Sequence, residues 1–225
     1  MLAELLALNL KMSKLKICCI SDTHQHHKKI IVPECDMIIH AGDFTYHGED
    51  DEVDRFLSWF GELPIKHKIL VCGNHEKGVA NNYPIFREKC RDRCIITLRN
   101  EHAVIEGFTI FGSPYSVRYG PWAYGMEDKD LMDIWNMALP DTDIFISHGP
   151  AHKQLDLTRG SINAGSKTLA KRLKQLKKLK LHVVGHIHEG RGVKINKKYI
   201  TVNASICGIP YTDVLINPIT VEIEK

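Results

Sequence analysis

The chain has 225 residues, a hydrophobic fraction of 44% and a formal net charge of +3. This length allows one buried core without disulfide bonds, and the composition argues against a disordered or membrane-embedded protein. Basic residues exceed acidic ones by only 30 to 27, so the overall charge gives no reason to expect nucleic-acid binding.

The start of the chain is expected to lie outside the folded core. We expect residues 1–12 to form an N-terminal extension and residues 13–225 to form one domain. Residues 1–10 are apolar, but they lack the basic start of a secretion signal and are too few to span a bilayer. Seven irregularly spaced cysteines, several of them within apolar runs, favour free thiols and a cytoplasmic location.

Short apolar runs alternate with polar or helical segments from residue 15 onward, which predicts a layered α/β fold. The last two pairs of strands flank short turns and are predicted to form hairpins. The predicted strands are residues 15–20, 37–40, 69–72, 95–98, 109–111, 144–147, 182–184, 193–195, 199–202, 214–216 and 220–223.

Amphipathic spacing predicts helices at residues 49–60, 83–91, 128–138 and 166–180. The last of these combines a leucine stripe with several basic residues. We favour a surface helix with its leucines packed on a sheet and its lysines solvated, and we keep a nucleic-acid surface as the alternative.

Five predicted strands are followed directly by residues of types that can bind metals. In an open α/β sheet the carboxyl ends of strands are where functional groups converge, so these residues are expected to meet in one crevice. The residues are Asp22 and His24, Asp43, Asn74 and His75, His148, and finally His186 and His188.

Imidazole and carboxylate together suit divalent ions such as zinc, manganese or iron. These residues are too many for one ion, whereas two ions about 3.5 to 4 Å apart would use them and would need an anionic bridge. We expect locally extended backbone to point Asp22 and His24 to one side, and likewise His186 and His188. A single Gly-Asp or a single histidine after a strand is more often a turn residue or a cap, so only their joint occurrence indicates a site.

These motifs resemble those of the calcineurin-like metallophosphoesterase superfamily, in the order Asp-x-His, Gly-Asp, Gly-Asn-His-Glu, a later histidine and Gly-His-x-His. The resemblance covers the chain from about residue 15 to its end. It implies a four-layer α-β-β-α sandwich with two mixed sheets and a dinuclear metal site at the carboxyl ends of the strands.

The resemblance also implies a role for each site residue. Asp43 would bridge the two ions, and His75 would contact the phosphate and donate a proton to the leaving oxygen. Asn74 would also contact the substrate. The first ion would be bound by Asp22, His24 and His188, and the second by Asn74, His148 and His186.

A finer resemblance exists to the small metallophosphoesterase-domain-containing proteins of animals, which act as cyclic nucleotide phosphodiesterases. Some animal members replace the first histidine of Gly-His-x-His by glycine, whereas this sequence keeps His186. Protein phosphatases of the superfamily carry arginines that are missing here. The segments that carry the resemblance are residues 41–45, 72–76, 111–114, 135–136, 147–150, 187–190 and 203–205.

The expected function is therefore phosphodiester hydrolysis by a hydroxide that bridges two divalent ions, with manganese preferred over iron, zinc or magnesium. The expected substrate is a cyclic nucleotide or a similar small phosphodiester, with no membrane partner. The alternatives are a nuclease, supported only by the basic helix 166–180, and a non-catalytic scaffold on the same fold.

Two groups of residues have weaker assignments. Polar side chains at Ser147, Asn203 and Ser205 are candidates to tether the second ring nitrogen of the ligand histidines. The aromatic residues between 115 and 124 would stack on a base or fill a partly buried loop. These aromatic residues are Tyr115, Tyr119, Trp122 and Tyr124.

Overall fold

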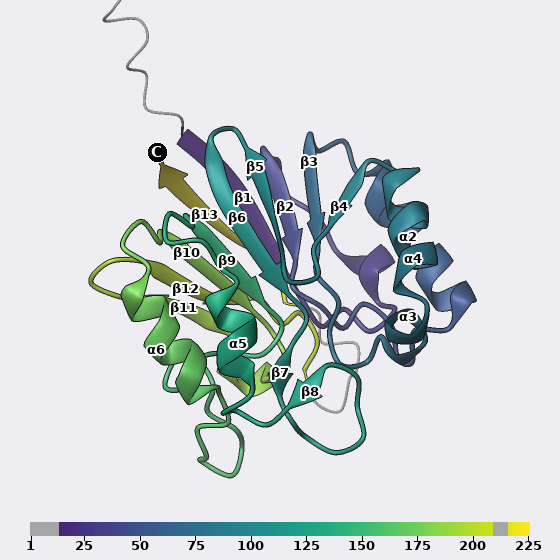
Figure 1. Ribbon diagram of the computed structural model, residues 1–225. Helices are drawn as coiled ribbons and strands as arrows, with labels where there is room; N and C mark the ends of the chain where they lie inside the picture. The colour runs from purple at the N-terminus through teal and green to yellow at the C-terminus, as the bar shows by residue number, and fades with distance from the viewer. Residues whose placement is uncertain (1–13, 209–215) are drawn as a thin grey trace, which may run out of the picture.

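Two β-sheets lie face to face in the computed structural model, which describes residues 14–208 and 216–225 (Figure 1). The expected extension at residues 1–12 lies outside the described residues. The first sheet has the order β13 (Ile219–Glu224), β1 (Lys14–Ile20), β2 (Met37–His40), β3 (His67–Leu70), β4 (Ile95–Thr97). The second has the order β11 (Gly192–Ile195), β12 (Ile200–Asn203), β10 (Leu181–Val184), β9 (Ile144–Ser147), β6 (Phe108–Ser113), β5 (Glu101–Ile105).

Both sheets are mixed, with parallel strands in the middle. In the first sheet β1 to β4 run parallel to one another, and only β13 is antiparallel to its neighbour β1. In the second sheet β6, β9, β10 and β12 are parallel, while β5 and β11 form antiparallel edges. The parallel strands of each sheet therefore end at a common edge, which is where the expected site residues follow them.

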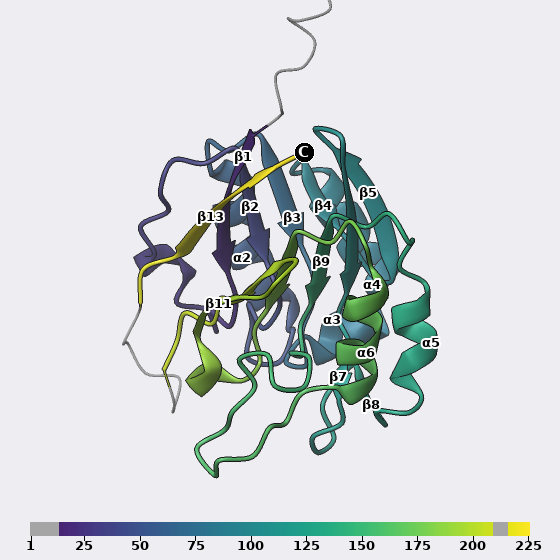
Figure 2. The same cartoon turned by 90° about the vertical axis from the view of Figure 1, so that its left-hand side faces the viewer.

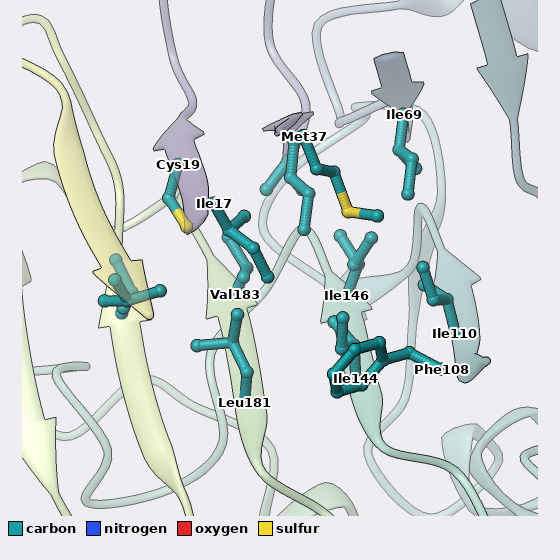
Figure 3. Close-up of a cluster of buried hydrophobic side chains, with 14 of the residues drawn as sticks. Ile17, Cys19, Met37, Ile69, Phe108, Ile110, Ile144, Ile146, Leu181 and Val183 are labelled. Atoms are coloured by element: carbon teal, nitrogen blue, oxygen red, sulfur yellow. The ribbon is translucent and has the colours of Figure 1, made fainter. Parts of the chain in front are cut away.

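The inner parallel strands, such as β2, β9 and β10, read as continuous apolar runs because both of their faces are buried. In β1, Ile17 and Cys19 pack toward the second sheet, whereas Cys18 and Ile20 pack toward the outer helices. Figure 3 shows the cluster between the sheets, in which Ile17 and Met37 from one sheet lie opposite residues such as Val183 of the other. This dry interface fixes the relative position of the two strand edges.

Helices cover both outer faces and complete four layers (Figures 1 and 2). α2 (Asp50–Glu62), α3 (Lys77–Asn81) and α4 (Tyr83–Arg91) lie on the side of the first sheet, with a short 3₁₀ turn, η1 (His27–Lys29), packed against Phe56 and Trp59 of α2. α5 (Leu131–Asn136) and α6 (Lys167–Gln175) lie on the second sheet. The expected α-β-β-α sandwich with two mixed sheets is confirmed.

The structure corrects several expected boundaries. β3 begins and ends two residues earlier than predicted, and β5 was not predicted, because its pattern is only partly buried. The helix predicted at 128–138 is limited to Leu131–Asn136. The helix predicted at 166–180 ends at Gln175, where Leu176 adopts an extended conformation. Leu176 and Leu179 are buried nonetheless, because they pack in the apolar cluster that α5 and α6 share.

The two predicted hairpins have different outcomes. β11 and β12 form the first one, as antiparallel neighbours. Of the second, residues 214 and 215 lie outside the described part of the chain, and residues 220–223 belong to β13, which pairs with β1 at the far edge of the first sheet. Within residues 14–208 and 216–225 no helix has the length and apolarity required to cross a membrane.

Candidate active site

The first sheet contributes five of the expected site residues from the loops that follow three neighbouring strands. Asp22 and His24 follow β1, Asp43 follows β2, and Asn74 and His75 follow β3. Backbone hydrogen bonds join the first two loops, since the amide of Asp22 donates to Gly42 and that of His24 donates to Asp43. All five side chains are buried, with none more than 6% exposed.

The second sheet contributes the remaining three residues. His148 follows β9, and His186 and His188 follow β10, at the carboxyl end of each strand. The two sheets are joined here by a bridge between Ser21 and Ser205 and by the backbone bond from Ile206 to Ser21. The five strand ends therefore meet in one place, as the sequence predicts.

Asp22, His24 and His188 form the first group of potential ligands. One donor atom from each lies within 4.8 Å of the others, and His188 Nε2 is 3.4 Å from Asp22 Oδ1. Burial raises the pKa of Asp22, but the neighbouring His188 and His148 outweigh this and hold it well below its usual value. The group thus combines a permanent carboxylate with two imidazoles.

Asp43, His148 and His186 form a second group, whose donor atoms also all lie within 4.8 Å of one another. His148 Nε2 lies 3.2 Å from Asp43 Oδ2 and 2.8 Å from Asn74 Oδ1. Asp43 also groups with His24 and His75, so its carboxylate connects the two clusters. The structure thereby brings together all eight residues singled out from the sequence.

The backbone of these loops differs from the expected extended form. Asp22, His24, Asp43 and His186 have φ values of 52°, 36°, 58° and 68°, a left-handed region that non-glycine residues adopt rarely. Tight left-handed turns, rather than extended backbone, bring Asp22 and His24 together. Such strain is typical of functional sites, where the surrounding structure holds it in place.

Backbone carbonyls orient four of the histidine rings. In each case Nδ1 lies within hydrogen-bond distance of a carbonyl oxygen, so Nδ1 donates and Nε2 is left facing the centre of the site. The carbonyls belong to Thr45 (3.2 Å from His24), Tyr46 (2.8 Å from His75), Ala41 (2.8 Å from His148) and Cys207 (2.7 Å from His188).

The polar side chains that were expected to tether the ligand histidines form hydrogen bonds with other groups. Ser147 donates to the carbonyl of Gly149 and contacts His182, which is not among the site residues. Ser205 Oγ instead lies 2.8 Å from both Asp22 Oδ2 and Asn203 Oδ1. The expectation was wrong for His24, His148 and His188, whose Nδ1 atoms are held by carbonyls, yet Ser205 does contact a site residue.

Residues 15–190 match the family model described as calcineurin-like phosphoesterase. This chain belongs to that family. It is 33% identical over 223 residues to human metallophosphoesterase domain-containing protein 1, with 88% of this chain and 68% of that protein covered.

Solved structures share the fold of this phosphoesterase. The TT1561 protein of Thermus thermophilus superposes with a TM-score of 0.60 at 13% identity, over 85% of this chain and 89% of that one. The phosphopantetheinyl hydrolase of Mycobacterium tuberculosis gives a TM-score of 0.56 at 15% identity, over 91% and 95% of the two chains. The chain is thus a hydrolytic phosphoesterase of a family that uses divalent metal ions.

The chemistry of the donor atoms fits divalent metal ions. With Nδ1 bonded to a carbonyl, neutral His148 presents a lone pair at Nε2 to two further acceptors, Asp43 and Asn74. Such an arrangement needs a positive charge at its centre. Without an ion, a proton on His148 supplies this positive charge. Burial lowers the pKa of His148, but the Asp43 carboxylate outweighs burial and raises this pKa to about 9. Burial lowers the pKa of His24 and of His186 to about 4, so both imidazoles are neutral at pH 7.

Glu76 supports the site in a way that the sequence did not reveal, although it ends the Gly-Asn-His-Glu motif. Its buried carboxylate accepts the backbone N–H of Asp43 at 2.9 Å and of Thr45 at 3.0 Å, the Thr45 hydroxyl at 2.8 Å and the N–H of Gly73 at 2.5 Å. It therefore joins the loops after β2 and β3. Burial and the charge of Asp43 raise the pKa of Glu76 to about 7.

Proposed function

We propose that this phosphoesterase is a phosphodiesterase that uses two divalent metal ions to hydrolyse cyclic nucleotides or similar small phosphodiesters. The observation that carries the proposal is the pair of buried donor groups connected through Asp43. Retention of every expected donor, including His186, supports an enzyme rather than a scaffold.

The assignment of ligands follows the two groups. Asp22, His24 and His188 would hold the first ion, and Asp43 would bridge to the second. Asn74, His148 and His186 would hold the second ion. Support comes from the Nε2 atoms oriented by carbonyl contacts at Nδ1 and from the mixture of imidazole, carboxylate and amide donors, which suits manganese, with iron, zinc and magnesium as alternatives.

When bound, two such ions polarise the phosphoryl group and make a nucleophile available from water near neutral pH. The neutral amide of Asn74 adds no negative charge, so the site retains the positive charge that binds a phosphodiester. This leaves the proton for the departing oxygen to be supplied by a side chain.

His75 is the residue we assign to that proton transfer. Its Nδ1 is fixed by the carbonyl of Tyr46 at 2.8 Å, and its Nε2 lies 3.9 Å from Asp43 Oδ2, at the margin of the donor groups. In the imidazolium form its transferable proton sits on Nε2, directed at the site. General acid catalysis of this kind contributes about 10²- to 10⁴-fold to the rate.

A reconstitution experiment tests the function. Chelator-treated protein is loaded with Mn²⁺, Fe²⁺, Zn²⁺ or Mg²⁺ and assayed on bis(p-nitrophenyl) phosphate, on 2′,3′- and 3′,5′-cyclic nucleotides, and on p-nitrophenyl phosphate. We expect metal-dependent hydrolysis of the diesters, with two ions per chain by elemental analysis. Activity on the monoester alone would overturn the diesterase assignment.

Two variants test the assigned residues. Asp43→Asn should lose both bound metal and activity, because the bridge loses its charge. His75→Ala should lose about 10²- to 10⁴-fold in turnover while keeping its metal. Parallel loss of metal and turnover in His75→Ala would show that His75 is a ligand rather than the acid.

We also propose that the enzyme works in a reducing compartment such as the cytoplasm. Cys18, Cys19 and Cys72 are free thiols buried among apolar side chains. Burial raises the pKa of Cys18 to about 12, so this thiol stays protonated and unreactive. Localisation of the tagged full-length chain by microscopy would test the proposal.

A further inference from the structure

A loop between two short strands lies beside the donor groups. β7 (Ser116–Val117) pairs with β8 (Gly125–Met126), and this ribbon lies near α3 in both Figure 1 and Figure 2. The amide of Ala123 donates to the carbonyl of Asn74 at 3.1 Å, and the adjacent Tyr124 is buried. The loop is thus anchored both at its base and directly on the Gly-Asn-His-Glu segment.

Trp122 extends from this anchored loop over His75. The two rings are stacked, with centroids 4.3 Å apart and planes inclined by 28°. Trp122 is only half-buried, whereas His75 is buried. The other aromatic residues of the segment lie elsewhere, since Tyr115 packs against Tyr124 and Tyr119 is 76% exposed. Trp122 is therefore the aromatic side chain of this loop that contacts a site residue.

The surroundings of Trp122 combine flat rings with positive charge. The exposed ring of His47 is parallel to the indole, with the centroids 6.4 Å apart and an angle of 2° between planes. The ammonium group of Lys77 lies 5.3 Å from the centre of the indole. A backbone bond from Gly78 to the carbonyl of His47 holds the two segments together. Such a surface suits a ligand that is both planar and anionic.

We infer that Trp122 forms a subsite for the planar base of the substrate, on the leaving-group side of the reaction. The inference rests on the proposed function, because it takes His75 as the donor of a proton to the leaving oxygen. In a 2′,3′-cyclic nucleotide that oxygen and the base belong to the same nucleoside. Departure of the oxygen toward His75 therefore brings the base toward the indole that covers His75.

Stacking of a base on a tryptophan is favourable with any base, because every base offers a π-face. The loop is held in place before the ligand arrives, so little conformational freedom is lost on binding. Lys77 adds a positive charge beside the stacking surface. This subsite predicts recognition of nucleotides over phosphodiesters without a ring, with weak discrimination among bases.

A matched pair of substrates tests the inference with the metal-loaded enzyme. 2′,3′-cyclic AMP and the 2′,3′-cyclic phosphate of methyl riboside share the scissile bonds and differ in the base. The wild type should prefer the nucleotide in kcat/KM by about 5- to 100-fold. Trp122→Ala should remove that preference mainly by raising KM for the nucleotide, and Trp122→Phe should keep most of it. Trp59→Phe, a change on the far side of the first sheet, serves as the control and should behave as wild type.

The outcomes separate a stacking subsite from a structural support. If Trp122→Ala lowers kcat equally for both substrates, Trp122 only positions His75 and the inference is overturned. Equilibrium binding provides a readout independent of turnover: AMP should bind more tightly than ribose 5-phosphate, and Trp122→Ala should abolish the difference. A wild type that hydrolyses no diester refutes the proposed function, whereas equal binding of the two monophosphates refutes the subsite.

Discussion

Replacing Glu76 by glutamine should destabilise the protein by loss of one specific hydrogen bond. All four partners of the carboxylate are donors: Oε2 accepts from Asp43 and Gly73, and Oε1 accepts from the amide and the hydroxyl of Thr45. A glutamine offers a single acceptor oxygen. Its best orientation keeps the bonds to Asp43 and Gly73 and turns the NH₂ group toward Thr45.

The expected magnitude follows from this count of partners. The Thr45 hydroxyl can rotate and accept from the new NH₂ group, but the Thr45 amide cannot, so one buried donor is left without its acceptor. That costs about 1–3 kcal/mol. Glu76→Gln also removes the repulsion between the carboxylates of Glu76 and Asp43. This gain offsets part of the lost hydrogen bond, so we expect a destabilisation in the lower half of the range of about 1–3 kcal/mol. Glu76→Ala deprives all four donors and should cost several kcal/mol, a large share of a typical stability of about 5–15 kcal/mol.

Urea unfolding at pH 8 in the presence of chelator measures these differences, because Glu76 is ionised there and bound metal does not contribute. Glu222→Gln is a matched control at an exposed ion pair with Lys14, and should cost less than about 1 kcal/mol. Both Glu76 variants should also retain less metal after dialysis, since Asp43 is held by this carboxylate. Equal destabilisation by glutamine and alanine would refute the reasoning.

Three further predictions concern Gly42, Ser205 and His27. Gly42→Ala places a Cβ 2.5 Å from His148 Nδ1, at a residue whose φ is +106°. The variant should therefore have both a lower melting temperature and a lower metal content. A normal melting curve would contradict this. Ser205→Ala removes the bond to Asp22 and should weaken metal binding about 10- to 100-fold in a chelator competition, whereas unchanged affinity would contradict it. Burial lowers the pKa of His27 to about 4, and neither ring nitrogen has a hydrogen-bond partner. The unfolded chain thus binds a proton below about pH 6.5 that the folded one does not. Wild type should lose about 2 kcal/mol more than His27→Phe between pH 7 and pH 5 in urea titrations, and parallel pH profiles would count against it.

The sequence alone was sufficient for most of the fold. Apolar runs such as residues 144–147 coincide with observed strands because parallel strands buried on both faces leave a continuous local signal. The partly buried β5 lacks that signal and was missed. The end of α6 was misplaced because Leu176 keeps the helical spacing while its backbone turns toward β10.

The identity of the candidate site residues was also readable from the chain, since each follows a strand directly. Their arrangement was decided by the tertiary structure. The carbonyls that orient His148 and His188 are backbone groups. Every residue has such a group, so the residue types in the sequence do not reveal these contacts. The contact of Trp122 with His75 joins residues 47 positions apart, and it exists because the loop is anchored on Asn74. Local pattern determines which chemistry the strand ends supply, whereas packing between distant segments determines the orientation of each group and what lies beside it.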